Sequence, residues 1–427
     1  MSIILLFVVF LLLILLSVPI AFSMGLATIA LLLLNGDGNA LITVLTKSFT
    51  GANSTSYLAI PFFMLAGSLM EHGGISKRII KFANGLVGHR RGGLAQVSVL
   101  VSMIFAGVSG SAVADTTAVG AVMMPAMNKK GYEKGFVASL QACAGTIGPI
   151  IPPSISMIIL AAMTGESVAN LFLAGIIPGI LIGLFLMLVS YFYARRMNIP
   201  LEKRMPVKEV IKAFFESIWA LFTPVIIIGG VLSGYFTATE AGMIAVIYSI
   251  IVGAFIYREL TWKTLWIALK NSVIGTGQII FLVATANVFA WMLTRMDFGM
   301  MCSTLLTSIT NNATIFLFVM VGFFLIVGCF IEISAACMIF IPILYPIASG
   351  FGVGFPFLII VLMTMAIGQI TPPVGVLLSL TTEMQGINIT ETFRFLPRVL
   401  LAMLMADLFC VLFPQLITII PTLLGTL

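Results

Sequence analysis

A polar stretch interrupts a long apolar run at residues 107–120, which read GVSGSAVADTTAVG. It holds three glycines, two serines, two threonines and one aspartate. Residues of these types could serve two chemistries. A serine between glycines could be the nucleophile of a membrane protease, or small residues and hydroxyls could form an unwound turn that holds an ion or a substrate. Within hydrocarbon, an unwound turn is stable only where protein surrounds it or where it lines a cavity.

Three further stretches interrupt apolar sequence in a similar way. EISAAC at 332–337 is a second run of small residues, and GTIGPIIPPS at 145–154 and AIGQITPPVG at 366–375 each contain a Pro-Pro pair. Proline lacks the N–H donor and clashes with the preceding helical turn, so each pair should break a helix and free its carbonyls. Free carbonyls and hydroxyls suit a small hard cation, and exposed helix N-termini suit a carboxylate. We call 107–111 and 332–337 the first and second tips, and 145–154 and 366–375 the first and second breaks.

The tips and breaks occur in the same order in both halves of the chain. The two proline pairs start 220 residues apart in a chain of 427 residues. Ser111 precedes Pro152 by 41 residues, and Ser334 precedes Pro372 by 38 residues. Paired broken helices are the sequence mark of secondary transporters that bind substrate and ions near the membrane midplane. The alternative is that glycine and proline only kink these helices, but two matched copies favour a binding site.

The protease alternative rests on Gly107–Gly110, which match the G-x-S-G string of rhomboid-type intramembrane serine proteases. A serine nucleophile needs a neighbouring base. The chain has only two histidines, His72 and His89, and both lie among charges at one predicted membrane boundary. A tip near the midplane would lie about 15 Å from that boundary, so protease activity is disfavoured. Neither a Walker A string nor a basic, aromatic groove is present, so we expect no ATP, no nucleic acid and no enzymatic reaction.

The composition is that of an all-α polytopic membrane protein. Hydrophobic residues make up 60% of the chain and charged residues 8%, against about 25% charged residues in soluble proteins. Apolar runs of about 20 residues recur along its length. Residues 3–34 form a run too long for a signal peptide, which Pro19 should kink or divide. The net charge of +6 is expected in short cytoplasmic loops.

These basic loops constrain the topology. Residues 92–128 lie between the basic clusters Lys77–Arg91 and Lys129–Lys134, so both ends should face the cytoplasm. Two full crossings need about 40 residues before any turn is added, which favours a re-entrant hairpin. Residues 313–348 are the second predicted hairpin, entering from outside, and the opposite entry sides make the repeat inverted. Two amphipathic segments, 201–215 and 258–270, are expected to lie flat at the cytoplasmic interface.

Five regions follow from this topology. They are N-terminal scaffold helices in 1–91; a first transport half in 92–164, with hairpin 92–128 and broken helix 135–164; scaffold helices and the interfacial arms in 165–296; a second transport half in 297–390, with hairpin 313–348 and broken helix 355–382; and a C-terminal helix in 391–427.

Three acids lie within apolar sequence, where ionisable residues are functional candidates. Asp115 follows the first tip and Glu332 opens the second, so each could tune a cation site or cap a helix. Asp407 has no predicted partner. The tips and breaks contain no Lys or Arg. A substrate carboxylate there should therefore meet hydroxyls such as Ser111 and Thr116, helix N-termini and bound sodium.

The chain resembles the large permease subunit of TRAP (tripartite ATP-independent periplasmic) transporters. The resemblance rests on four motifs in this order: GVSGSAVADTTAVGAVMMPAM, GTIGPIIPPS, FTATEAG (236–242) and GQITPPVG. The resemblance covers essentially the whole chain. It implies an elevator-type, sodium-driven importer of the ion-transporter superfamily, located in the bacterial inner membrane. It also implies a small membrane subunit and a periplasmic binding protein that delivers acidic substrates, and no loop here is long enough to be a binding domain.

The resemblance also implies ligands for at least two sodium ions and a substrate class. Family substrates include sialic acids and C4-dicarboxylates, of which we favour sialic acid. The alternative within this fold class is a stand-alone sodium/carboxylate symporter. The implied sodium ligands are Gly107, Ser109, Ser111, Gly148, Ile151 and Ser154 in the first half, and Gly328, Ser334, Gly368, Thr371 and Val374 in the second. The predicted substrate-binding residues are Ser111, Asp115, Thr116, Pro153, Ser334, Ala335 and Pro373.

Overall fold

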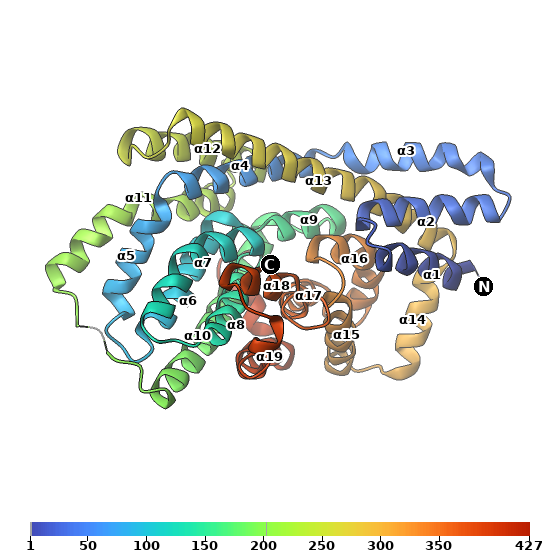
Figure 1. The fold of residues 1–427 in the computed structure, drawn as a ribbon. Coiled ribbons are helices and arrows are strands. Elements are labelled where there is room, and N and C mark those ends of the chain that lie inside the picture. The colour runs from blue at the N-terminus through green and yellow to red at the C-terminus, as the bar shows by residue number, and fades with distance from the viewer. Residues whose placement is uncertain (1, 202) are drawn as a thin grey trace.

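The computed structural model describes residues 2–201 and 203–427, and within them every regular element is a helix (Figure 1). Five of these helices are long and apolar enough to cross a membrane, or seven if two bent helix pairs each count as one span. The prediction of an all-α, polytopic architecture therefore agrees with the described part of the chain.

The N-terminal region forms five helices. Pro19 precedes α2 and separates it from α1, so the predicted division of residues 3–34 is confirmed. A proline at this position cannot donate to the preceding turn. The bounds are α1 Ser2–Leu15, α2 Ile20–Leu34, α3 Leu41–Ala52, α4 Ala59–His72 and α5 Ile75–Val87.

Lys77, Arg78 and Lys81 lie on helix α5, so the expectation of a short loop was wrong for this part of the cluster, whereas Arg90 and Arg91 follow the helix in a turn. Arg78 forms an ion pair of 2.8 Å with Glu259, and Lys81 forms one of 2.7 Å with Glu216. The partners come from the segment before α13 and from α11. The basic face of α5 is therefore fixed against two later parts of the chain, which no local pattern indicated.

The two halves that contain the tips and breaks fold into matching series of helices. In each series two helices meet at the tip, a third helix runs to the break, and a short helix follows it. Both predicted breaks are therefore breaks in the structure. The first series is α6 Gly93–Ser109, α7 Ala112–Lys129, α8 Lys134–Gly145 and α9 Ile155–Thr164. The second is α15 Ala313–Gly328, α16 Ile333–Gly350, α17 Gly354–Gly368 and α18 Val376–Gln385.

The middle region differs from the prediction in one respect. Residues 207–215 and 262–270 are not separate segments, because each continues into the long helix that follows. A capping box at Thr261 starts α13, and no proline stops it before Arg295. Residue 202, within the predicted arm 201–215, lies outside the described residues. The bounds are α10 Val168–Arg196, α11 Val207–Leu232, α12 Ala238–Ile251 with a π-helical turn Val252–Ile256, α13 Trp262–Arg295 and α14 Phe298–Ile309.

The C-terminal region holds two helices rather than the single predicted one. Helices α19 (Leu396–Leu412) and α20 (Gln415–Leu423) are bent by 64° at a short break. Pro414 lies in this break, and a proline disfavours helical geometry in the residue before it.

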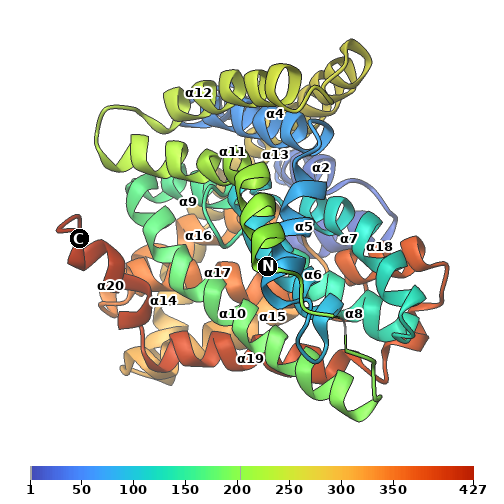
Figure 2. The same cartoon turned by 90° about the vertical axis from the view of Figure 1, so that its left-hand side faces the viewer.

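The helices form an outer edge and a buried interior. Helices α3, α4, α12 and α13 lie along one edge, at the top of Figure 1, where α13 contacts α3 and α4, and α12 contacts α4. Helix α13 has 34 residues, which corresponds to about 51 Å, and it contacts both α4 and α16. Helices α10, α17 and α19 lie on the side of the molecule away from this edge (Figure 2). Every residue of α8 after Lys134 and every residue of α17 except Pro356 is buried, so these two helices lie in the interior.

Candidate functional site

A cavity of ≈ 280 Å³ lies where both tips and both breaks meet. Two further elements close it, α4 and the middle of α13. The structure therefore joins four stretches that are far apart in the sequence. The lining residues are Met64, Gly110, Ser111, Ala112, Val113, Pro149, Ile155, Ser156, Gln278, Ile279, Leu282, Glu332, Ile333, Ser334, Gln369 and Val376.

Four helix N-termini converge on this cavity. Residues from the first turns of α7, α9, α16 and α18 all line it. The residues preceding these helices are Ser111, Ser154, Glu332 and Gly375, and the side chains of the first three accept hydrogen bonds from their own helix. Helix N-termini present N–H donors and a partial positive charge, so the cavity is arranged to hold an anion.

The first tip packs against the first break. The Ile155 N–H donates to the Gly110 carbonyl at 3.5 Å, which joins the two segments directly. Gly148 lies so close to Ser111 that a Cβ atom on Gly148 would be 2.8 Å from the Ser111 carbonyl oxygen. Only glycine permits this approach without a shift of the tip.

The second tip packs against the second break in the same manner. A Cβ atom on Gly368 would lie 2.5 Å from the Gly328 Cα atom, so two backbones are in contact where these glycines meet. The Glu332 carboxylate accepts hydrogen bonds from the N–H groups of Ser334 at 2.8 Å and Ala335 at 3.2 Å. Glu332 thus caps α16, which was one of the two roles considered for it.

The predicted sodium ligands fall into the two tip–break contacts. The Ser154 hydroxyl donates to the Pro149 carbonyl at 2.6 Å, and the Thr371 hydroxyl donates to the Ile367 carbonyl at 2.8 Å. The Thr371 oxygen keeps its lone pairs, and the Ser154 oxygen, which also accepts from the Met157 N–H at 3.2 Å, keeps one, so each can still coordinate a cation. These oxygen-rich contacts suit a hard cation such as sodium.

The predicted substrate residues divide into two groups. Ser111 and Ser334 line the cavity. Asp115 and Thr116 are fully buried behind the first tip and do not line it. Pro153, Ala335 and Pro373 are also absent from the lining, although each belongs to a tip or break that contributes other residues to it.

Sequence reasoning missed three polar residues that line the cavity. Ser156 follows the first break by two residues, and Gln369 lies inside the second break. Both could have been proposed from their positions in the motifs. Gln278 comes from the middle of α13, and only its polarity within an apolar run could have drawn attention to it.

The charge of the lining matches the expectation for the tips and breaks. Among the described residues that line the cavity, none is Lys or Arg, and Glu332 is the single acid. Because Glu332 is engaged with the α16 N-terminus, the ends of α7, α9 and α18 are the positive ends left for a substrate anion.

A second cavity of ≈ 240 Å³ continues from the first. The two share Met64, Ser111, Val113 and Ile155. The second cavity then extends along α4 to polar residues at its C-terminal end. These residues are Ser68, Glu71, Asn271 and Ser272.

The geometry gives no support to a serine nucleophile. The Ser109 hydroxyl donates to the Ser111 carbonyl at 3.5 Å, and the His72 ring bonds to the Ser68 carbonyl at 2.8 Å. No hydrogen bond joins a serine hydroxyl to a histidine ring among the described residues, and the Ser109–histidine pair that a protease requires is not formed.

Asp407 lies outside the cavity and has a partner that the sequence did not indicate. The Thr364 hydroxyl of α17 donates to the Asp407 carboxylate of α19 at 2.8 Å, and both side chains are buried. This pair joins α19 to the helix that leads into the second break.

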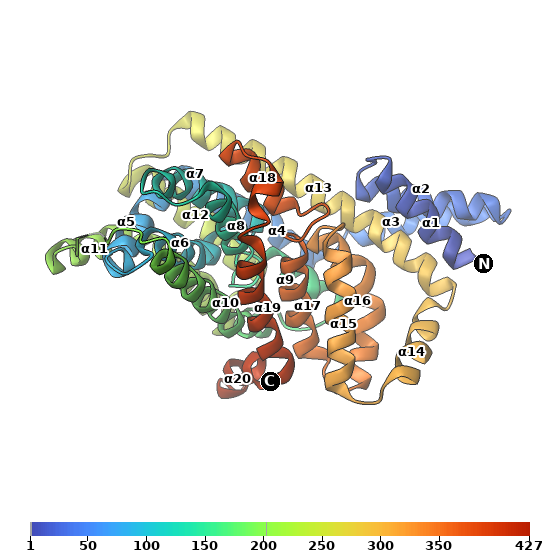
Figure 3. The same ribbon diagram turned by 60° about the horizontal axis from the view of Figure 1, so that its bottom comes forward.

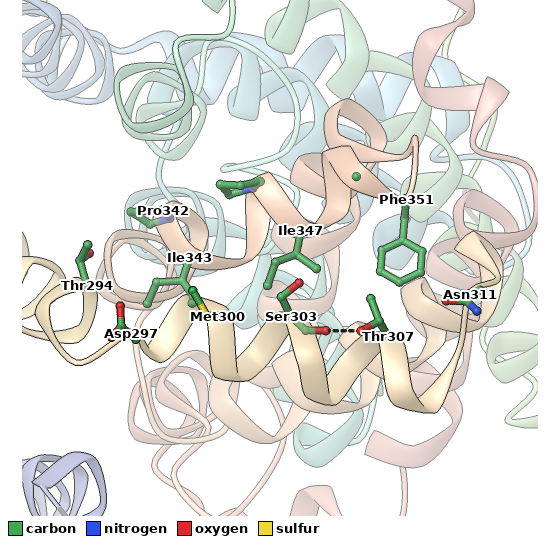
Figure 4. Close-up of a pocket in the computed structure, with 13 residues that line it drawn as sticks. Thr294, Asp297, Met300, Ser303, Thr307, Asn311, Pro342, Ile343, Ile347 and Phe351 are labelled. Carbon is green, nitrogen blue, oxygen red and sulfur yellow. Dashed lines mark hydrogen bonds between the residues drawn. The ribbon is translucent and has the colours of Figure 1, made fainter.

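A larger cavity, of ≈ 820 Å³, lies elsewhere, between α14 and α16 (Figure 4). Its α14 wall includes Ser303 and Thr307, and the Thr307 hydroxyl donates to the Ser303 carbonyl at 2.8 Å. Helix α14 stands apart from the rest of the molecule in Figure 3. The lining contains no residue of either tip or either break, so the smaller cavity is the candidate site.

Comparison with known proteins identifies the relatives of this chain. Residues 7–416 match the family described as "Tripartite ATP-independent periplasmic transporter, DctM component". The chain is 43% identical over 345 residues to the 2,3-diketo-L-gulonate TRAP transporter large permease protein YiaN of Escherichia coli (strain K12), with 81% of each chain covered. It is 34% identical over 417 residues to the sialic acid TRAP transporter permease protein SiaT of Haemophilus influenzae (strain 86-028NP), with 97% of this chain and 68% of SiaT covered.

A solved structure shares the fold. The YdaH transporter of Alcanivorax borkumensis superposes with a TM-score of 0.60 over 89% of each chain, at 13% sequence identity. At this identity the similarity concerns the fold alone.

Proposed function

Because the chain belongs to the DctM family, the large permease subunits of TRAP transporters, we propose that it imports an organic acid by sodium-coupled secondary transport. Its apolar helices make it a multi-pass membrane protein. The proposed location is the bacterial inner membrane. No chemical step is involved, because the protein binds the acid on one side and releases it on the other.

The observation that carries this proposal is the convergence of four helix N-termini, three of them without a capping carboxylate, on one cavity without Lys or Arg in its lining. Each helix end contributes about 0.3–1 kcal/mol to anion binding, or about 2 kcal/mol when partly buried. That is modest beside the cost of desolvating a carboxylate. Sodium ions beside the cavity would supply the missing attraction, so that the anion binds well only when sodium is bound.

The proposed sodium sites are the two tip–break contacts. The first would use Ser109, Ser111 and Ser154 together with backbone carbonyls, and the second would use Ser334 and Thr371 in the same way. The close approach at Gly148 supports this assignment, because it places the Ser111 carbonyl of the tip directly beside the break. Sodium here acts as a coupling ion and charge partner.

The transport cycle that we propose is an elevator. The α6–α7 and α15–α16 pairs would be re-entrant hairpins of an inverted repeat and would move with both broken helices. The long α13 and its neighbours would form the static scaffold. In support, Gln278 of the long helix α13 lines the cavity together with residues of both tips, as a residue of a scaffold helix beside the site would. The connected cavity that reaches Glu71 would be the path to the cytoplasm.

The proposed partners are a small membrane subunit and a periplasmic binding protein that delivers the substrate. The substrate class is an acid of the sialic acid, C4-dicarboxylate or diketogulonate type, in line with the printed names of YiaN and SiaT. All three types carry at least one carboxylate for the helix N-termini. Hydroxyls and amides such as Ser156 and Gln369 would bind the remaining polar groups.

The proposal is tested by reconstituting the transporter in liposomes and imposing a sodium gradient across their membrane. Uptake of a labelled organic acid is measured with the full set of components, and then with the small subunit or the binding protein left out. We expect uptake only with all three components. Sodium-dependent uptake by this chain alone would instead establish a stand-alone sodium/carboxylate symporter.

A further inference from the structure

A separate apolar groove of ≈ 280 Å³ lies between the C-terminal end of α10 and the start of α19. It shares no residue with the candidate transport site. Two arginines are the charged groups of its lining. The lining residues are Phe136, Val189, Phe192, Tyr193, Arg196, Phe395, Arg398, Val399 and Leu401.

The floor of this groove is aromatic and tightly packed. The rings of Phe136 and Tyr193 stack with centroids 3.6 Å apart, and the Phe395 ring meets them edge-on at 78° and 80°. At the mouth, Phe192 and Leu401 are 56% and 58% exposed. A floor of packed rings with an open apolar mouth suits a hydrocarbon chain that enters from the side.

The two arginines at the groove carry unpaired charge. Arg196 ends α10 and Arg398 lies in the first turn of α19, and both are exposed. Neither forms an ion pair within the described residues. Arg394, by contrast, pairs with Glu133 at 3.5 Å. Two guanidinium groups beside one apolar groove complement a phosphate that is joined to a hydrocarbon chain.

We propose that this groove binds one anionic phospholipid of the cytoplasmic leaflet, with an acyl chain on the aromatic floor and the phosphate between Arg196 and Arg398. Basic pockets between membrane helices on the cytoplasmic side bind such headgroups. The side follows from the basic cluster that begins at Arg195, which the positive-inside rule places in the cytoplasm. The lipid would hold α10 and α19 together beside Phe136 of α8.

The test is a lipid titration of the full chain, purified in mild detergent and followed by native mass spectrometry. The probes are phosphatidylglycerol and zwitterionic phosphatidylcholine. We expect phosphatidylglycerol to bind more tightly. Arg196→Gln and Arg398→Gln should each weaken that binding about fivefold, and the double variant about 25-fold. Leu401→Trp, which keeps both charges and obstructs the mouth, should also weaken it.

The matched control is Arg195→Gln, because Arg195 is exposed and adjacent but does not line the groove. It should bind phosphatidylglycerol as the unmodified chain does. Equal binding of both lipids, or equal losses in Arg195→Gln and Arg196→Gln, would overturn the proposal. Displacement of the lipid by millimolar inorganic phosphate would show an anion site alone. A helix of another subunit cross-linked over Leu401 would show that protein, not lipid, covers the groove.

Discussion

A Cβ atom on Gly148 would lie 2.8 Å from the carbonyl oxygen of Ser111, so the first break and the first tip are in backbone contact. Gly148→Ala should push the tip away and separate the carbonyls assigned to the first sodium ion. We expect the sodium concentration for half-maximal transport to rise about tenfold or more, the equivalent of a lost hydrogen bond to a charged group.

The control for this variant is Gly322→Ala. Gly322 lies in α15 with no atom within 4 Å of an added Cβ, so the same substitution there should leave the sodium response unchanged. Membrane insertion of both variants is checked by fractionation. If Gly148→Ala transports with an unaltered sodium response, the tip–break contact is not an ion site.

Removal of single hydroxyls tests the ion assignment more finely. Ser111→Ala and Thr371→Ala should weaken transport and its sodium dependence together, because each removes an oxygen from a proposed site. Thr304→Ala is the matched control, since the Thr304 hydroxyl also donates to the carbonyl four residues earlier and lies outside the site. Uptake is measured as a function of sodium concentration for both variants. If the curves of Thr371→Ala and Thr304→Ala coincide, the second sodium site is refuted.

Because the cavity lining has no basic residue, substrate binding should be sensitive to an added negative charge. Gln278→Glu keeps the shape of the side chain and adds a negative charge opposite the helix N-termini. Repulsion of the substrate carboxylate should raise the KM about tenfold or more, since unit charges several ångströms apart interact by a few kcal/mol at a protein surface. Gln415→Glu, an exposed glutamine on α20, should leave KM unchanged. An unchanged KM in Gln278→Glu would mean that the substrate binds elsewhere.

The buried pair of Thr364 and Asp407 predicts an effect on stability rather than on sodium coupling. Thr364→Val removes the hydroxyl that donates to the carboxylate at 2.8 Å and should cost about 1–3 kcal/mol of unfolding free energy. The midpoint of thermal unfolding in detergent measures this. The double variant Thr364→Val/Asp407→Leu should lose less than the sum of the single changes, because the residues are coupled. Additive losses would show that the hydrogen bond contributes nothing.

Local chemistry explains what the sequence could predict. The Pro152 and Pro372 pairs break helices wherever they occur, and Pro19 likewise separates α1 from α2. The positions of both breaks could therefore be predicted from the sequence. Ser111 was proposed as a site residue from its hydroxyl in the first tip and Ser334 from the family resemblance, and both line the cavity.

Contacts between distant segments explain what could not be predicted from the sequence. Gln278 belongs to the site only because α13 runs past the cavity where both tips meet, and the residues near it in the sequence do not indicate this. Lys81 lies on α5 and pairs with Glu216 of α11, so a basic run that looked like a loop is a packed helix. Thr116 has the right chemistry for the substrate, but its side chain is buried against Gly145, away from the cavity.

The most direct test of sodium coupling is the uptake of a labelled organic acid into liposomes that hold the complete transporter, under an imposed inward sodium gradient. Parallel samples receive choline in place of sodium, with and without an inward proton gradient. The proposed function predicts accumulation against the substrate gradient with sodium, which collapses when an ionophore dissipates the sodium gradient. Equal accumulation in choline driven by protons would contradict it.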